Sequence, residues 1–138
     1  MTVTLPPEYR PTEDEPFMNE IQTEYFRQKL LNWRHELLRE SDETLQHLQE
    51  GGAQEADIAD RAQTEADRTL ELRTRDRARK LISKIDAALL RIEDGSYGFC
   101  EETGEPIGVR RLDARPIATL SIEAQERHER LEKTHRDE

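Results

Sequence analysis

The 138-residue chain contains one cysteine, one tryptophan and only 5% aromatic residues. A single cysteine, Cys100, excludes a disulfide bond within the chain. With 33% apolar residues, the chain can bury only a small globular core. No apolar run approaches the roughly 20 residues of a membrane span, and the N-terminus lacks the charged-then-apolar pattern of a signal peptide. We therefore expect a cytoplasmic protein without a membrane segment.

Positive charge is also scarce, because 21 Lys and Arg residues accompany 31 Asp and Glu residues, for a formal net charge of −10. Nucleic-acid binding depends largely on cations that neutralise phosphates, so this balance argues against direct DNA binding. The charges are unevenly distributed: residues 40–60 are acidic, whereas residues 73–84 and 110–115 are rich in Arg and Lys. This asymmetry is compatible with different partners for the two regions.

Apolar residues recur at steps of three and four along residues 19–50 and 57–93, which predicts two paired helices. Gly51 and Gly52 are expected to end the first helix, and Asp57 to cap the second. The expected contact stripes are Phe26, Leu30, Trp33, Leu37, Thr44 and Leu48 on the first helix, and Ala62, Ala66, Leu70, Leu72, Ile82, Ile85, Leu89 and Ile92 on the second. The chain is therefore expected to be mainly α-helical, with a long antiparallel coiled-coil hairpin.

The predicted organisation has three parts. A proline-rich extended segment occupies residues 1–18 near the globular end, the hairpin occupies 19–94 with its tip at about 51–60, and a globular region occupies 95–138. Asn19 and Ser121 are expected N-caps of the first and last helices. Between them, the glycine- and proline-rich stretch after residue 94 predicts a hairpin loop, with short β-type pieces near residues 97–99 and 107–109.

Trp33 is expected to face the basic stretch of the second helix, because both lie at similar distances from the turn. A cation–π contact with Arg73 or Arg77 is one interpretation. A solvated basic face is the other.

Several motifs occur together in an order that is specific to one family. They are FMNEIQTEYFRQKLLNWRHEL at residues 17–37, DIADRA at 57–62 and GVRRLDARP at 108–116. Over most of residues 17–124 the chain resembles the DksA/TraR family of bacterial transcription factors. The resemblance implies a non-enzymatic regulator whose coiled coil enters the secondary channel of RNA polymerase and modulates promoter-complex stability with the alarmone ppGpp, as in the stringent response.

The chain departs from this family at the zinc site. The four family cysteines correspond to Cys100, Thr103, Ser121 and Ala124, and a tetrahedral zinc site needs four nitrogen or sulfur donors. We therefore expect no zinc and a degenerate, metal-free zinc ribbon. The side chains expected to hold it by packing are Tyr97, Phe99, Ile107, Val109, Leu112, Ile117, Leu120 and Ile122.

The resemblance also implies functional residues at the tip. Asp57, Asp60 and Ala62 match the DxxDxA tip motif, whose carboxylates can interact with basic groups or a magnesium-bound network and whose alanine permits close approach. The alternative for the two aspartates is helix capping.

A second implied site lies at the base of the coil. Leu81, Lys84 and Arg115 match the family positions that bind ppGpp. Arg offers a bidentate fork and Lys a mobile charge for phosphate groups. The alternative is that Lys84 and Arg115 are surface charges that hold the coil to the globular region. A further basic position of the family is Gln125 here, so the strength of the ppGpp dependence stays open.

Two other functions share these features. A coiled-coil scaffold or chaperone would use the acidic tip only for solubility, and a transcript-cleavage stimulator would use its carboxylates in metal-dependent hydrolysis. We expect a monomer, because the hairpin can bury its own apolar stripe. No catalytic constellation and no cofactor are expected.

Overall fold

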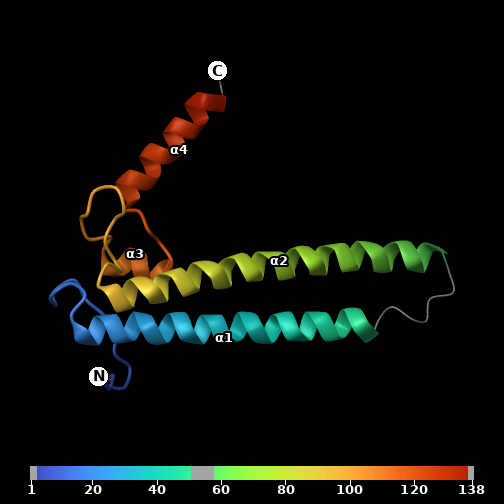
Figure 1. Cartoon of the computed structure of the whole chain (residues 1–138), viewed down its shortest axis with the longest axis horizontal. Coiled ribbons are helices and arrows are strands. Elements are labelled where there is room, and N and C mark those ends of the chain that lie inside the picture. The colour runs from blue at the N-terminus through green and yellow to red at the C-terminus, as the bar shows by residue number, and fades with distance from the viewer. Residues whose placement is uncertain (1–2, 51–57, 137–138) are drawn as a thin grey trace. The chain divides into compact units, whose positions relative to one another are not determined.

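The computed structural model describes residues 3–50 and 58–136, and the side chains of all of these except 48–50, 58–60 and 136. It contains four helices in this part of the chain: α1 (Glu20–Glu50), α2 (Ile58–Asp94), α3 (Val109–Ala114) and α4 (Ile122–Arg136) (Figure 1). The mainly helical fold predicted from the sequence is confirmed. None of the helical segments described has an apolar stretch long enough to cross a membrane.

Two of the expected helix caps, Asn19 and Ser121, form capping hydrogen bonds. Gly51 and Gly52, expected to end the first helix, and Asp57, expected to cap the second, lie outside the described residues. α1 begins directly after Asn19, whose Oδ1 accepts the backbone N–H of Gln22 at 2.8 Å. α4 begins after Ser121, whose Oγ accepts the N–H of Ala124 at 3.2 Å. Such side-chain acceptors satisfy amides that have no partner within the helix.

The predicted β-type piece near residue 109 is wrong. Val109 begins the six-residue helix α3, directly after Gly108, whose φ of 104° turns the chain. Val109 and Leu112 are both buried, since residues three apart lie on the same face of a helix. Near residue 99 the prediction is closer, because Phe99 forms an isolated antiparallel bridge with Pro106.

The chain forms two compact units, and each is described by itself. The globular unit contains Met1–Leu30 and Ala87–Glu138, and the hairpin unit contains Leu31–Asp86. The three-part division expected from the sequence stays a prediction.

Within the hairpin unit, α1 and α2 pack in antiparallel fashion. Leu37, Ala78 and Ile85 are buried. Ion pairs join the described parts of the helices: Arg34 Nε lies 2.7 Å from Asp86 Oδ1, and His47 Nδ1 lies 2.8 Å from Glu71 Oε1. The partner on α2 moves back along the sequence, from Asp86 to Glu71, as the residue on α1 advances from Arg34 to His47, which is the order that an antiparallel hairpin requires.

The apolar stripe predicted for the first half of α2 is wrong. Leu70 is 63% exposed and Leu72 is 48% exposed. Their neighbour Glu71 is half-buried instead, and steps of four and three from it reach Arg75 and the buried Ala78. A seven-residue repeat therefore places both leucines beside the contact face rather than on it. Ala62 and Ala66 are also exposed, and Leu48 lies outside the described side chains.

Arg73 and Arg77 are exposed, as the solvated-face interpretation expected. Among the side chains described, the recorded cation–π contact is instead that of Lys29 with the Tyr25 ring, at 5.8 Å from Nζ to the ring centroid.

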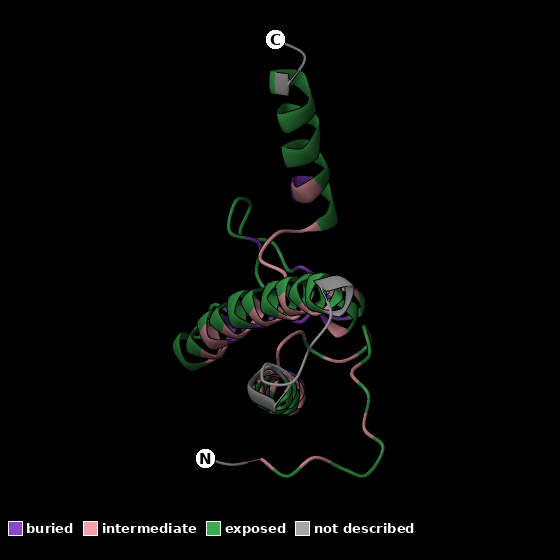
Figure 2. Cartoon of the chain, turned by 90° about the vertical axis from the view of Figure 1, so that its right-hand side faces the viewer, coloured by how far each residue is buried: buried purple, intermediate pink, exposed green. Residues whose placement is uncertain are grey.

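The core of the globular unit brings together the start of α1, the end of α2 and the loop region. Phe26 and Leu30 are fully buried, and the Phe26 ring lies 5.8 Å from that of Tyr97. Of the loop residues expected to pack, four are buried: Tyr97, Ile107, Val109 and Leu112. Ile117 and Leu120 are half-buried. Phe99 is 38% exposed, but its ring packs edge-on against Phe17. Ile122 is 55% exposed, so the prediction is wrong for Ile122. Figure 2 shows α4 exposed along most of its length. Ala124, in the first turn of α4, is fully buried.

The N-terminal segment lies against this core. The Tyr9 ring meets the Tyr25 ring edge-on at 5.9 Å, and Phe17 meets Phe99 at 5.4 Å. Gln22 is fully buried and ties the segment to α1, since its amide nitrogen donates to the Thr12 carbonyl at 3.1 Å and its amide oxygen accepts the Met18 N–H at 2.8 Å.

Candidate functional site

The residues assigned to the tip lie at the edge of the described structure. Asp57 falls outside it, and Asp60 lies in the first turn of α2 with an undescribed side chain. Ala62 is exposed on α2. The role of this motif therefore stays a prediction.

The residues assigned to ppGpp fall in both units. Lys84 is exposed and Leu81 half-buried on α2 in the hairpin unit, whereas Arg115 follows α3 in the globular unit and is exposed. The structure therefore describes no common site for the three. Gln125 is half-buried on α4, and its amide donates to Glu129 Oε1 at 3.3 Å.

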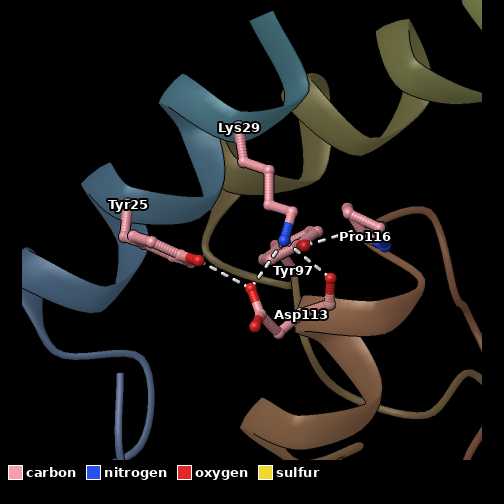
Figure 3. Close-up of polar contacts among 5 residues, drawn as sticks. All are labelled: Tyr25, Lys29, Tyr97, Asp113 and Pro116. Carbon is pink, nitrogen blue, oxygen red and sulfur yellow. Dashed lines mark hydrogen bonds and ion pairs between the residues drawn. The ribbon is translucent and has the colours of Figure 1, made fainter. Parts of the chain in front are cut away.

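A polar cluster surrounds the backbone at Arg115, and Figure 3 shows its members. Lys29 Nζ on α1 lies 2.6 Å from Asp113 Oδ1 and 2.7 Å from the carbonyl oxygen of the same residue. The Tyr25 hydroxyl donates to Asp113 Oδ1 at 2.6 Å. On the other side of Arg115, the buried Tyr97 hydroxyl donates to the Pro116 carbonyl at 2.8 Å.

The ionisation of these groups follows from the same contacts. Partial burial would raise the pKa of Asp113, but the hydrogen bonds from Lys29 and Tyr25 outweigh it and lower that pKa below its ordinary value. Burial, followed by the bond to Asp113, raises the pKa of Tyr25 to about 12. Asp113 is therefore an anion at neutral pH and Tyr25 is a neutral donor to it.

A cavity of about 640 Å³ adjoins this cluster. It is lined by Glu8, Tyr9, Arg10, Tyr25, Lys29 and Asp113. Both signs of charge are present, so the lining does not select a cationic or an anionic ligand. Sequence reasoning did not find this cluster, because Lys29 and Asp113 are 84 residues apart and belong to no shared motif.

The positions of the family's zinc ligands converge on one buried thiol. Cys100 is 3% exposed and Ala124 is fully buried. The Cys100 sulfur accepts hydrogen bonds from the backbone of Ser121, and from the backbone and hydroxyl of Thr103. Burial raises the pKa of this thiol, but the hydrogen bonds outweigh burial and lower it to about 6.

These residues do not fit zinc. A structural zinc site needs four nitrogen or sulfur ligands, and here the four positions supply one sulfur and otherwise hydroxyl groups and a methyl group. No group of three His, Cys, Asp or Glu side chains in the described ranges could hold a metal ion elsewhere. The four histidines are all exposed.

Two family models match the chain. The model described as the N-terminal domain of the DnaK suppressor protein DksA matches residues 22–92, and that of the prokaryotic dksA/traR C4-type zinc finger matches residues 95–130. The second match includes the four positions of the family's zinc ligands, so the sequence pattern of the zinc finger is kept although most of its ligands are absent.

Curated relatives and a solved structure agree with these matches. The chain is 70% identical over 131 residues to the RNA polymerase-binding transcription factor DksA of Caulobacter vibrioides, covering 95% of this chain and 92% of that protein. It is 47% identical to the protein of the same name from Escherichia coli, covering 83% of this chain and 76% of that one. The structure of transcription factor DksA2 from Pseudomonas aeruginosa is similar with a TM-score of 0.77 and 46% identity, over 85% of this chain and 90% of that one. The chain therefore belongs to the DksA/TraR family, as a member without the full set of zinc-ligand cysteines.

Proposed function

We propose that this chain is a transcription regulator that binds RNA polymerase and inserts its coiled-coil tip into the secondary channel. The observation that carries the proposal is the 70% identity over nearly the full length of a factor named for polymerase binding. The DxxDxA motif at Asp57, Asp60 and Ala62 supports the tip as the active part. A polymerase-bound effector also explains how a chain of net charge −10 can act on transcription without contacting DNA.

The proposed mechanism requires no catalysis and no cofactor. The tip carboxylates contact basic or magnesium-bound groups of the polymerase, and this contact destabilises short-lived promoter complexes. Phosphates of ppGpp contact Lys84 and Arg115, because guanidinium and ammonium groups are suited to phosphate oxygens. Gln125 supplies no charge, so we expect weaker coupling to ppGpp than in relatives with a cation there. The regulator acts as a cytoplasmic monomer.

The test is multi-round transcription from a ribosomal RNA promoter with purified RNA polymerase, with and without ppGpp. We expect the wild type to inhibit, ppGpp to enhance inhibition, and Asp60→Asn to bind polymerase but lose inhibition. Asp76→Asn is a matched control, because it removes the same charge from an exposed position of α2 outside the tip motif.

Other outcomes separate the alternatives. Absence of any wild-type effect from a folded protein would favour a scaffold. Shortening of the transcript in backtracked complexes would favour a cleavage stimulator. Equal loss of inhibition in Asp60→Asn and Asp76→Asn would contradict the specific role of the tip.

A further inference from the structure

We propose that Lys29, Asp113 and Tyr97 are positioning residues for Arg115. They hold the backbone on both sides of Arg115, so that its exposed guanidinium binds a phosphate-bearing ligand while the main chain that carries it stays rigid. This inference rests on the proposed function, which assigns Arg115 to ppGpp. We call Tyr25, Lys29, Tyr97, Asp113 and Pro116, drawn in Figure 3, the Arg115 clamp.

The first half of the clamp acts at the C-terminal end of α3. The last carbonyl groups of a helix have no partner within it and carry partial negative charge, so a cation there is favourable. Lys29 supplies that cation and contacts both the carbonyl oxygen and the carboxylate of Asp113. The Tyr25 hydroxyl holds the same carboxylate oxygen. One side chain of α1 therefore fixes both the main chain and the side chain two residues before Arg115.

The second half acts directly after Arg115. Tyr97 is 2% exposed and its ring packs on Phe26, so its hydroxyl has little freedom to move. This hydroxyl donates to the carbonyl of Pro116, and the proline ring fixes the φ angle of that residue. The peptide unit that follows Pro116, the residue after Arg115, is thus held by a rigid donor.

Backbone hydrogen bonds complete the arrangement. The Arg115 N–H donates to the Arg111 carbonyl at 2.7 Å, and the Arg115 carbonyl accepts the Ala118 N–H at 3.0 Å. Arg111 in turn donates from Nε to the Leu120 carbonyl at 2.9 Å. Main-chain freedom at Arg115 is therefore small, although the residue lies outside any helix.

The side chain of Arg115 contrasts with its backbone. It is exposed, and no hydrogen bond or ion pair to another side chain in the described ranges holds it. Arg111 is engaged with Leu120, and Arg110 lies 3.9 Å from Glu13, so the guanidinium of Arg115 differs from both in having no such partner in the described ranges. A group presented from a fixed backbone loses less conformational freedom on binding, which increases affinity without any new contact.

The experiment compares Lys29→Met with Arg27→Met. Both remove a cation from α1 that pairs with a carboxylate, but Arg27 pairs with Glu24 on its own helix, at 2.8 Å. The first measurement is ¹⁵N relaxation of the Arg115 and Ala118 amides in the free protein. The second is ppGpp binding to the complex of RNA polymerase with each variant, with binding to polymerase alone subtracted.

We expect the two amides to be rigid in the wild type and in Arg27→Met, and mobile in Lys29→Met. We expect Lys29→Met to weaken ppGpp binding by about three- to tenfold, the effect of releasing one or two ordered groups. Lys29→Arg should restore most of the affinity. Lys29→Met combined with Arg115→Ala should bind no more weakly than Arg115→Ala alone, because a residue that acts through Arg115 has nothing left to position.

A failure of the clamp and a failure of the ppGpp assignment would give different results. Unchanged relaxation at Arg115 in Lys29→Met, or full additivity of Lys29→Met with Arg115→Ala, would overturn the clamp while leaving the ppGpp assignment intact. If wild type adds no ppGpp binding to polymerase, or if Arg115→Ala has no effect, the ligand assignment in the proposed function fails, and the positioning of Arg115 for that ligand fails with it.

Discussion

Gly98→Ala tests how firmly the N-terminal segment is packed on the globular unit. Gly98 has a φ of +91°, and a Cβ built there would lie 3.2 Å from Met18 Cγ and 3.2 Å from Phe17 Cζ. Such contacts are closer than ordinary van der Waals packing, so the methyl group must displace the segment. The substitution therefore combines backbone strain with a steric effect.

Gly95→Ala separates the two effects. Gly95 has a φ of +84°, and a Cβ there would meet no atom within 4 Å. Left-handed backbone in a residue with a side chain costs about 1–2 kcal/mol, and this applies to both variants. Overpacking costs about 1–3 kcal/mol, and because Met18 is flexible we expect the lower end, about 1 kcal/mol, in Gly98→Ala alone. Gly98→Ala should therefore destabilise the protein by about 1 kcal/mol more than Gly95→Ala.

Urea denaturation followed by the near-ultraviolet circular dichroism of the tyrosines measures this difference, because all three lie in the globular unit. The extra destabilisation should shrink when Met18→Ala is combined with Gly98→Ala, since two of the three close contacts, those with Met18 Cγ and Cε, are then removed. Equal destabilisation by Gly95→Ala and Gly98→Ala, or no relief by Met18→Ala, would refute the packing of the segment against residue 98.

Three further predictions concern the degenerate zinc region. A strong chelator should leave the melting temperature unchanged, and a clear decrease would contradict the metal-free assignment. The Cys100 thiol should titrate with a midpoint near its lowered pKa of about 6, and the absorbance of the thiolate measures this titration. Folding lowers the pKa of this thiol, so the thiolate stabilises the fold fully when the pH is above the pKa of the unfolded chain, about 8.5. This contribution declines as the pH falls toward 6. Cys100→Ser should therefore lower the melting temperature more at alkaline pH than at acidic pH. Ser121→Ala should cost about 1 kcal/mol in urea denaturation by removing the cap of α4, and a cost near zero would show that Ser121 Oγ is not the cap.

The parts of the fold that follow local rules were predictable. Asn19 and Ser121 act as caps because their side chains satisfy the amides three residues later, which spacing alone reveals. Helix α3 was missed because valine after glycine is typical of a strand, and the burial of Val109 and Leu112 that favours a helix arises only in the folded unit.

The candidate site was predictable only where a motif carries it. Arg115 is found by resemblance, but its supports come from Tyr25 and Lys29 on α1 and from Tyr97, which no local pattern connects with Asp113 or Pro116. For Leu70 and Leu72, the sequence pattern predicted a contact that the structure lacks. Their apolar spacing assigned them to the contact face of α2, but their charged neighbour Glu71 occupies that face.

We expect no zinc at this site, so packing contacts have to hold the zinc-finger pattern in place. Structural zinc contributes about 10–16 kcal/mol of apparent free energy to small peptide folds, which the loop around Cys100 has to replace. Here the loop is not self-contained: Tyr97 packs on Phe26 of α1, and Phe99 contacts Phe17 of the N-terminal segment. Each large aromatic side chain that is buried against another part of the chain contributes a free energy of folding comparable to that of a few hydrogen bonds. The region is therefore held by elements outside it: Phe26 of α1 packs on Tyr97, and the adjacent Tyr25 and Lys29 of the same helix bind Asp113 beside Arg115.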